Sequence, residues 1–152
     1  MELEERPLSV RWVNSATALE IAESVAPYGR EDGAPEGFKQ LRVWQLAVDL
    51  VAVCYSISTK FPTHEQFGLT SQLRRAAASV ALNIAEGWGR NRNQEFARFA
   101  EIARGSLNEV DCALEIAVRL EYVQREDLLQ FDQLNKQLGR MLYRLIAKLR
   151  KG

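Results

Sequence analysis

The sequence contains little of what metal sites, disulfide frameworks and membrane spans require. It has one histidine, His64, and two cysteines, Cys54 and Cys112, and their spacing matches no metal site. Both cysteines lie within apolar helical patterns, so we interpret them as small buried hydrophobic residues. No apolar run reaches the roughly 18 residues of a transmembrane helix, and the acidic N-terminus lacks a signal-peptide pattern. We therefore expect a cytoplasmic protein without a metal, a cofactor or a membrane partner.

The sequence also lacks a net charge, but its charges are unevenly distributed. Residues 1–36 carry three basic and eight acidic residues, a net charge of −5, whereas the remainder carries 17 basic and 12 acidic residues, a net charge of +5. A moderately basic body permits a nucleic-acid partner without requiring one. Hydrophobic residues make up 47% of the chain and charged residues 26%, which is the balance of a globular protein rather than a disordered one.

The few helix-breaking residues divide the chain. Five glycines and prolines fall between positions 27 and 37, a density typical of a linker. We predict that residues 1–37 are an acidic leader containing at most one short helix, and that 38–152 form the folded domain. Further breaks at Phe61-Pro62 and at Gly87-Trp88-Gly89 separate predicted helices within this domain.

Apolar residues recur at spacings of three and four from residue 38 onward, which predicts helices over about 39–60, 64–87 and 94–122, and a fourth that begins at Arg125 to Asp127 and runs to about 150. No segment shows sustained period-two alternation. Four long helices joined by short turns indicate an all-α, antiparallel up-down-up-down four-helix bundle with an N-terminal extension. Thr63 and Gln66 fit a capping box for the second helix. Gly105, inside the third helix, predicts a tight helix–helix contact there.

The predicted helix over 39–60 is apolar on more than one side. One stripe contains Leu41, Trp44, Val48, Val51 and Tyr55, and a second contains Leu46, Leu50, Val53 and Ile57. Because the core of one bundle covers one face, we expect a second subunit to cover the other. The predicted interface between copies consists of Trp44, Leu46, Leu50, Val53 and Ile57.

Residues 38 to about 123 resemble the bacterial four-helix-bundle family encoded in intervening sequences of 23S rRNA genes, which is related to the accessory protein of diversity-generating retroelements. The resemblance is carried by Phe38-x-x-Leu41-x-Val43-Trp44-Gln45, Phe61-Pro62, Glu65, Gly68-Leu69, Gln72-Leu73-Arg74-Arg75-Ala76, Asn83-Ile84-Ala85-Glu86-Gly87, Glu95-Phe96, Phe99, Ala103-x-Gly105-Ser106-Leu107 and Glu109. It implies an antiparallel bundle that forms a ring-shaped homopentamer. For relatives within retroelements it also implies an RNA, DNA or reverse-transcriptase partner, and for most members no established biochemical role. The leader departs from the family pattern, as does Arg92, where a serine is expected.

A group of polar residues within the predicted helices is the first candidate site. Asn83 and Glu86 are three residues apart and share a helix face. Glu86 ends its helix, where the dipole disfavours a carboxylate, so an arginine is expected nearby. The group is either a ligand or phosphate site or, as we favour, a hydrogen-bond network that fixes helix register and subunit contacts. Its members are Arg74, Arg75, Asn83, Glu86, Ser106 and Glu109.

The sequence offers no arrangement of residues typical of an enzyme. No serine has a recognisable His/Asp partner pattern, no Glu-x-x-His motif of a di-metal bundle is present, and no glycine loop suits a phosphate. Glu86 and Glu109 could pair as acid and base only if the fold brought them together. We expect neither catalysis nor a small-molecule substrate.

Two basic features form the second candidate site, a nucleic-acid contact. Arginines flank the loop after Trp88, and a basic stripe at four-residue spacing runs along the last helix. The alternatives are phosphate contact, which gives affinity without sequence reading, and an ordinary solvated helix face. Trp88 either stacks on a base or closes the bundle end. The residues are Arg90, Arg92, Lys136, Arg140, Arg144 and Lys148. The sequence thus favours a homo-oligomeric accessory protein with a nucleic-acid or nucleoprotein partner, or a structural scaffold without one.

Overall fold

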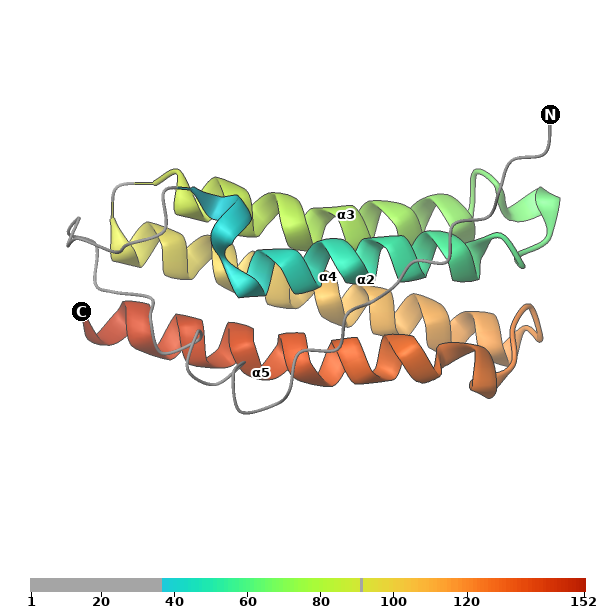
Figure 1. The fold of residues 1–152 in the computed structure, drawn as a ribbon. Helices are drawn as coiled ribbons and strands as arrows, with labels where there is room; N and C mark the ends of the chain where they lie inside the picture. Colours follow the sequence, from blue (N-terminus) through green and yellow to red (C-terminus); the bar gives the residue numbers. More distant parts are fainter. Residues whose placement is uncertain (1–36, 91) are drawn as a thin grey trace, which may run out of the picture.

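The computed structural model describes residues 37–90 and 92–152, which form helices and turns (Figure 1). The long helices are α2 (Arg42–Ser58), α3 (Leu69–Trp88), α4 (Asn93–Arg119) and α5 (Leu129–Lys151). Three short 3₁₀ helices, η1 (Phe38–Gln40), η2 (Thr63–Glu65) and η3 (Arg125–Leu128), precede α2, α3 and α5. Successive long helices pack antiparallel and α2 also packs against α5. The predicted up-down-up-down bundle is confirmed, while the predicted leader, apart from Gly37, lies outside the described residues.

The core contains one apolar stripe from each long helix. Each stripe follows the three-and-four spacing that gathers side chains on one side of a helix. Burial of a side chain as large as leucine or phenylalanine stabilises the fold by about 1.5–3 kcal/mol. The largest fully buried side chains are Phe96, Phe131, Leu46, Leu50, Leu73, Ile84, Leu114, Leu138 and Leu142.

The close approach of α3 and α4 depends on Gly87. A Cβ at this buried glycine would lie 2.5 Å from Cδ2 of Phe96 and 2.9 Å from Cβ of Phe99, closer than side-chain atoms tolerate. The tight contact predicted at Gly105 is absent, because that glycine is exposed and a Cβ there would meet nothing within 4 Å. The glycine that helix packing requires is therefore at the end of α3, not in the middle of α4.

The first turn of α3 is capped from the preceding turn. Oε2 of Glu65 accepts a hydrogen bond from the backbone N–H of Leu69 at 2.8 Å, satisfying one of the donors that a helix start leaves free. The capping box predicted for Thr63 and Gln66 is wrong, because Thr63 belongs to η2 and α3 begins at Leu69. Because Glu65 caps the N–H group of Leu69, four residues later, α3 begins further along the chain than the sequence pattern predicts.

The end of α4 is a Schellman motif with a glutamate in the position that glycine usually takes. Tyr122 N–H donates to the carbonyl of Ala117 at 2.9 Å, and Glu121 N–H donates to the carbonyl of Val118 at 3.0 Å. This pattern places Glu121 in the left-handed region, with φ of 61°. Non-glycine residues adopt this conformation at a cost in free energy, so Glu121 is a strained point of the fold.

The two cysteines differ in environment. Cys54 is buried in the core, and burial raises the pKa of its thiol to about 12. Cys112 is exposed on α4, so the expectation of two buried cysteines is wrong for this residue. Both thiols are free.

Candidate functional site

The stripe of α2 predicted to meet another copy lies mostly in the core of its own chain. Leu46, Leu50 and Ile57 are 1%, 0% and 6% exposed, so they are unavailable to a second subunit. Val53 is half-buried against the core. For Leu46, Leu50 and Ile57 the predicted interface with a second subunit is therefore wrong. Of the predicted set, Trp44 belongs to the other stripe, which α3 and α5 leave partly uncovered.

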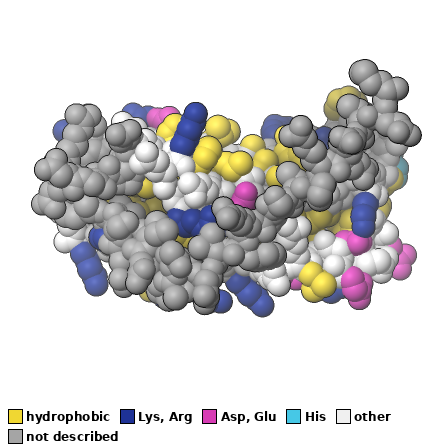
Figure 2. Space-filling view, viewed as in Figure 1, with side chains coloured by type: hydrophobic (Ala, Val, Ile, Leu, Met, Phe, Trp, Pro, Cys, Tyr) yellow, Lys and Arg dark blue, Asp and Glu magenta, His cyan; other side chains and the backbone are white. Residues whose placement is uncertain are grey.

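Part of the exposed apolar surface lies where α2 and α3 meet the solvent together. Arg74 of α3 contacts both Tyr55 and Ser58 of α2, so the antiparallel register puts Val48 at the level of Leu82. Val48, Tyr55 and Leu82 are 39%, 44% and 68% exposed. Figure 2 shows hydrophobic side chains gathered over these two helices. We define the α2–α3 apolar face as Trp44, Val48, Val51, Tyr55 and Leu82.

One half of the predicted polar network joins α3 to α4. Asn83 Nδ2 donates to Oγ of Ser79 at 3.0 Å and to the carbonyl of Ser79 at 2.8 Å. The Ser79 hydroxyl lies 2.8 Å from Oγ of the buried Ser106, and because it already accepts from Asn83 it is free to donate to Ser106. The relay Asn83–Ser79–Ser106 fixes the register of the two helices. Ser79 was not predicted, although its place four residues before Asn83 was a signal.

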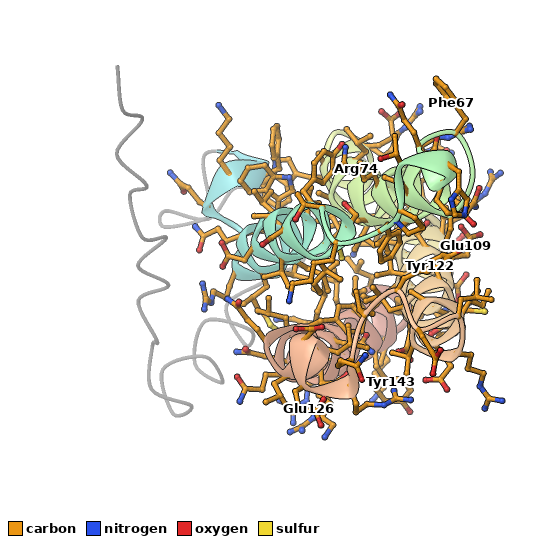
Figure 3. All side chains as sticks on the ribbon, turned by 90° about the vertical axis from the view of Figure 1, so that its right-hand side faces the viewer. Phe67, Arg74, Glu109, Tyr122, Glu126 and Tyr143 are labelled. Atoms are coloured by element: carbon orange, nitrogen blue, oxygen red, sulfur yellow. The ribbon has the colours of Figure 1, made fainter. Side chains whose placement is uncertain are left out.

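The other predicted members do not join this relay within the described chain. The Nε of Arg74 donates to Oγ of Ser58 at 2.9 Å, and its guanidinium lies over the ring of Tyr55, 4.6 Å from the centroid. Glu86 pairs with Arg90 one turn later. The arginine offsets the unfavourable interaction between this carboxylate and the helix dipole at the end of α3. Figure 3 shows Arg74 and Glu109 well apart on separate helices.

Two of the predicted network residues, Arg75 and Glu109, are exposed and form no ion pair within the described residues. The six residues therefore do not form one network: Asn83 and Ser106 share the relay, Arg74 and Glu86 each have separate partners, and Arg75 and Glu109 form no ion pair within the described residues. Glu86 is paired with Arg90 at the end of α3, and Glu109 lies on α4 outside that pair, so these two carboxylates are not brought together.

The two basic features lie at the same end of the bundle only at Lys148, because the loop after α3 and the last turns of α5 share that end (Figure 1), whereas Lys136, Arg140 and Arg144 lie further back along α5. Arg90 lies over the ring of Phe99, 5.2 Å from the centroid, and Arg92 is exposed as the N-cap residue of α4. Trp88 is half-buried and packs edge-on against Phe96, with 6.3 Å between centroids, so it closes this end of the core.

The stripe on α5 presents its cations to solvent. Lys136, Arg140 and Arg144 are exposed and have no ion-pair partner among the described residues. Lys148 is half-buried and interacts with a neighbour. The exposed part of the stripe is therefore a set of unneutralised charges on one helix face, which suits a polyanion.

A cluster at the opposite end of the bundle ties the α2–α3 turn to the end of α4. The Tyr122 hydroxyl donates to Oε1 of Glu65 at 2.9 Å, and the His64 ring stands edge-on to the Tyr122 ring. The Leu69 N–H and then the Tyr122 hydroxyl hold the pKa of Glu65 below its usual value. The bond to Glu65 in turn raises the pKa of Tyr122. Since Glu65 uses both oxygens to hold the fold, we interpret the cluster as structural.

The remaining searches concern metals and membranes. Within residues 37–90 and 92–152, no group of histidine, cysteine and acidic side chains could hold a metal ion. Over the same ranges, no helix combines the length and apolar character that crossing a membrane requires.

Comparison with known proteins adds the family. The chain matches the profile of the 23S rRNA-intervening sequence protein over residues 39–144. A search of curated proteins found no match. The matched range contains α2, α3, α4 and most of α5, and it includes the Asn83–Ser79–Ser106 relay and the α2–α3 apolar face. This four-helix bundle therefore belongs to the 23S rRNA-intervening sequence protein family.

Proposed function

We propose that the chain is a non-enzymatic, cytoplasmic accessory protein that assembles with copies of itself and binds the phosphate backbone of nucleic acid. Two observations carry the proposal: the α2–α3 apolar face, and the exposed cations Lys136, Arg140 and Arg144 of α5, which have no ion-pair partner among the described residues. Large apolar side chains grouped on one surface mark interaction sites, whereas single exposed ones are ordinary. The pentameric ring implied by the family resemblance is the assembly that we propose.

Self-assembly follows from the shape of the face. Leu82 stands at the same level as Val48, and Ala78 and Ala85, which flank Leu82 one helical turn away on either side, are small enough to admit a neighbouring side chain. In a ring each copy uses two different surfaces, so the apolar face of one copy would meet another surface of the next.

Light scattering after size exclusion tests the assembly. At 17.3 kDa per chain, a pentamer has a mass of about 87 kDa. Leu82→Asp places a charge in the face and is expected to shift the mass toward that of one chain. The matched control is Leu129→Asp, because Leu129 is 63% exposed against 68% for Leu82 but lies at the start of α5. A wild-type monomer, or equal loss of mass in both variants, contradicts the proposed interface.

Nucleic-acid binding follows from the charges. Cations that have no partner in the protein release counterions when they meet phosphates, which makes binding depend steeply on salt. A ring repeats the α5 stripe in every copy and so multiplies its field. Contacts of this kind recognise a backbone rather than a base sequence.

Fluorescence anisotropy with labelled RNA and DNA oligonucleotides of mixed sequence tests the binding. We expect salt-dependent affinity that falls roughly tenfold in Arg140→Gln/Arg144→Gln, with a shallower salt slope. The control, Arg75→Gln/Arg104→Gln, removes two exposed cations elsewhere and is expected to change the affinity less than about twofold. An oligomer that binds neither nucleic acid near 50 mM salt would be a structural scaffold only, and the nucleic-acid half of the proposal would be wrong.

A further inference from the structure

The excess positive charge of the bundle is concentrated at one end. We define the basic end as residues 38–48, 82–99 and 145–152, which are η1, the loop after α3 and the adjoining two turns of each long helix. It carries eight basic and two acidic residues, a net charge of +6. The acids are Glu86 and Glu95, and the bases are Lys39, Arg42, Arg90, Arg92, Arg98, Lys148, Arg150 and Lys151.

The opposite end has no such excess. By the same definition it comprises residues 52–75 and 113–135, with five basic and six acidic residues and a net charge of −1. The middle of the bundle carries four of each sign. The net charge of +5 from residue 37 onward is therefore the property of one end rather than of the whole body.

Helix stability does not explain all of these cations. Basic residues near the last turn of α5 suit its dipole. In contrast, α2 begins at Arg42 without an acidic residue in its first turn, and Arg92 is the N-cap of α4. Cations are unfavourable at both of these helix starts. Arg90 and Arg150 pair with Glu86 and Glu101, respectively.

Four exposed cations of the basic end form no ion pair within the described part of the chain: Lys39, Arg92, Arg98 and Lys151. A cluster of like charges without partners repels itself, so its presence points to an anionic occupant.

The acidic leader joins the chain at this end. Residues 1–36 carry a net charge of −5 and continue into Gly37, which precedes η1; there Phe38 packs against Trp44, with 5.1 Å between ring centroids. Even at the helical rise of about 1.5 Å per residue, 36 residues span about 54 Å, against about 35 Å for the whole of α5. A leader that is helical or more extended is therefore long enough to reach every cation of the basic end.

We propose that the leader docks in cis on the basic end of its own bundle and competes with nucleic acid whose contact extends from the α5 stripe onto this end. The charges of −5 and +6 are complementary, and a covalent connection gives the leader an effective concentration in the millimolar range. The contact is electrostatic and therefore weakens as salt rises. Its effect on nucleic acid rests on the proposed function, but the docking itself does not.

Zero-length carbodiimide cross-linking tests the docking without nucleic acid. The leader carboxylates are expected to couple to Lys148 and Lys151 in the full-length chain, but not to Lys60 at the opposite end or Lys136 in the middle of the bundle. About 0.5 M salt is expected to remove the products. Equal coupling to Lys60 would overturn the proposal. In a mixture of ¹⁴N- and ¹⁵N-labelled chains, products joining the two labels would overturn docking in cis.

Nucleic-acid affinity tests the competition, with two variants of equal net charge. The leader variant carries E23Q, E31Q, D32N and E36Q, and the control carries E109Q, D111N, E121Q and E126Q on exposed residues outside the basic end. Near 50 mM salt we expect the leader variant to bind roughly fivefold tighter than wild type and the control less than about twofold tighter. The difference is expected to disappear near 300 mM salt.

The outcomes separate the two proposals. Equal tightening in both variants, or none in the leader variant while wild type binds, would overturn the competition. If none of the three proteins binds RNA or DNA, the proposed nucleic-acid function is lost, and the cross-linking pattern alone decides whether the leader docks.

Discussion

Gly87→Ala should destabilise the bundle, although alanine is the better helix former. In an unconstrained helix the substitution would stabilise by about 1 kcal/mol. Here the new Cβ would lie 2.5 Å from Cδ2 of Phe96 and 2.9 Å from Cβ of Phe99. Phe96 is 1% exposed and packed by Trp88, so its ring has little room to turn away.

The magnitude follows from two opposing effects. Overpacking of a core costs about 1–3 kcal/mol, and the helix propensity of alanine offsets about 1 kcal/mol of it. We expect a net loss of up to about 2 kcal/mol, because α3 and α4 must separate at their crossing. Gly105→Ala is the matched control, since a Cβ at that exposed position meets nothing within 4 Å. It is expected to stabilise by about 0.5–1 kcal/mol.

Urea unfolding followed by circular dichroism, at one fixed protein concentration, measures both changes. The midpoint of Gly87→Ala should fall and that of Gly105→Ala should rise, with unchanged slopes. A Gly87→Ala variant that gains as much stability as Gly105→Ala would refute the close approach of α3 and α4. A destabilised Gly105→Ala would show that Gly105 faces another subunit rather than solvent.

Four further predictions concern other positions. Glu121→Gly should raise the free energy of unfolding by about 1 kcal/mol, because glycine adopts the φ of 61° without strain; no gain would contradict strain there. Ser106→Ala should cost about 1 kcal/mol through the lost bond to Ser79, and Ser79→Ala/Ser106→Ala should cost less than the sum of the single changes; additive losses would exclude the relay. Hydrogen bonds and neighbouring cations hold the pKa values of Glu65, Glu115 and Asp127 below their unfolded values of 4.5, 4.5 and 3.8. The stability that these carboxylates provide is therefore present at neutral pH, and it is lost as the pH falls through their folded pKa values. Urea midpoints between about pH 5 and pH 3 should therefore fall, and fall less in Tyr122→Phe, which lacks the bond to Glu65; an equal fall would exclude that bond. Finally, a thiol reagent near pH 8 should modify Cys112 rapidly and Cys54 only on unfolding, and Cys112→Ser should abolish the rapid phase.

The helices were predictable because their signals are local. Pro62 and the Gly87-Trp88-Gly89 stretch separate three periodic segments, and the order of helices along the chain leaves few ways to pack them. The predicted start of α3 failed by about one turn because the cap comes from Glu65, in a turn whose geometry the sequence pattern does not fix.

The faces of the helices were harder to predict. Helix α2 has two apolar stripes, and which one is buried depends on the positions of α3 and α5 rather than on α2 itself. The same reason explains why the burial predicted for Cys112 was wrong, because its apolar neighbours in the sequence lie on another face of α4. Predicting the relay through Ser79 would have required knowing which residues of α3 and α4 lie at the same level, and the sequence alone does not show this. In contrast, the basic end could have been found by counting charges at helix termini once the antiparallel order was assumed.

A chain with equal numbers of positive and negative residues would be expected to ignore charged surfaces. This one carries +6 at one tip of an elongated body and −1 at the other, so its described domain has a permanent electric moment along its long axis. When the leader is released from the basic end, such a body turns before it binds, presenting its positive tip to a phosphate layer or a cation-exchange bead. Orientation on arrival is therefore built into the arrangement of the four helices, whatever the total charge.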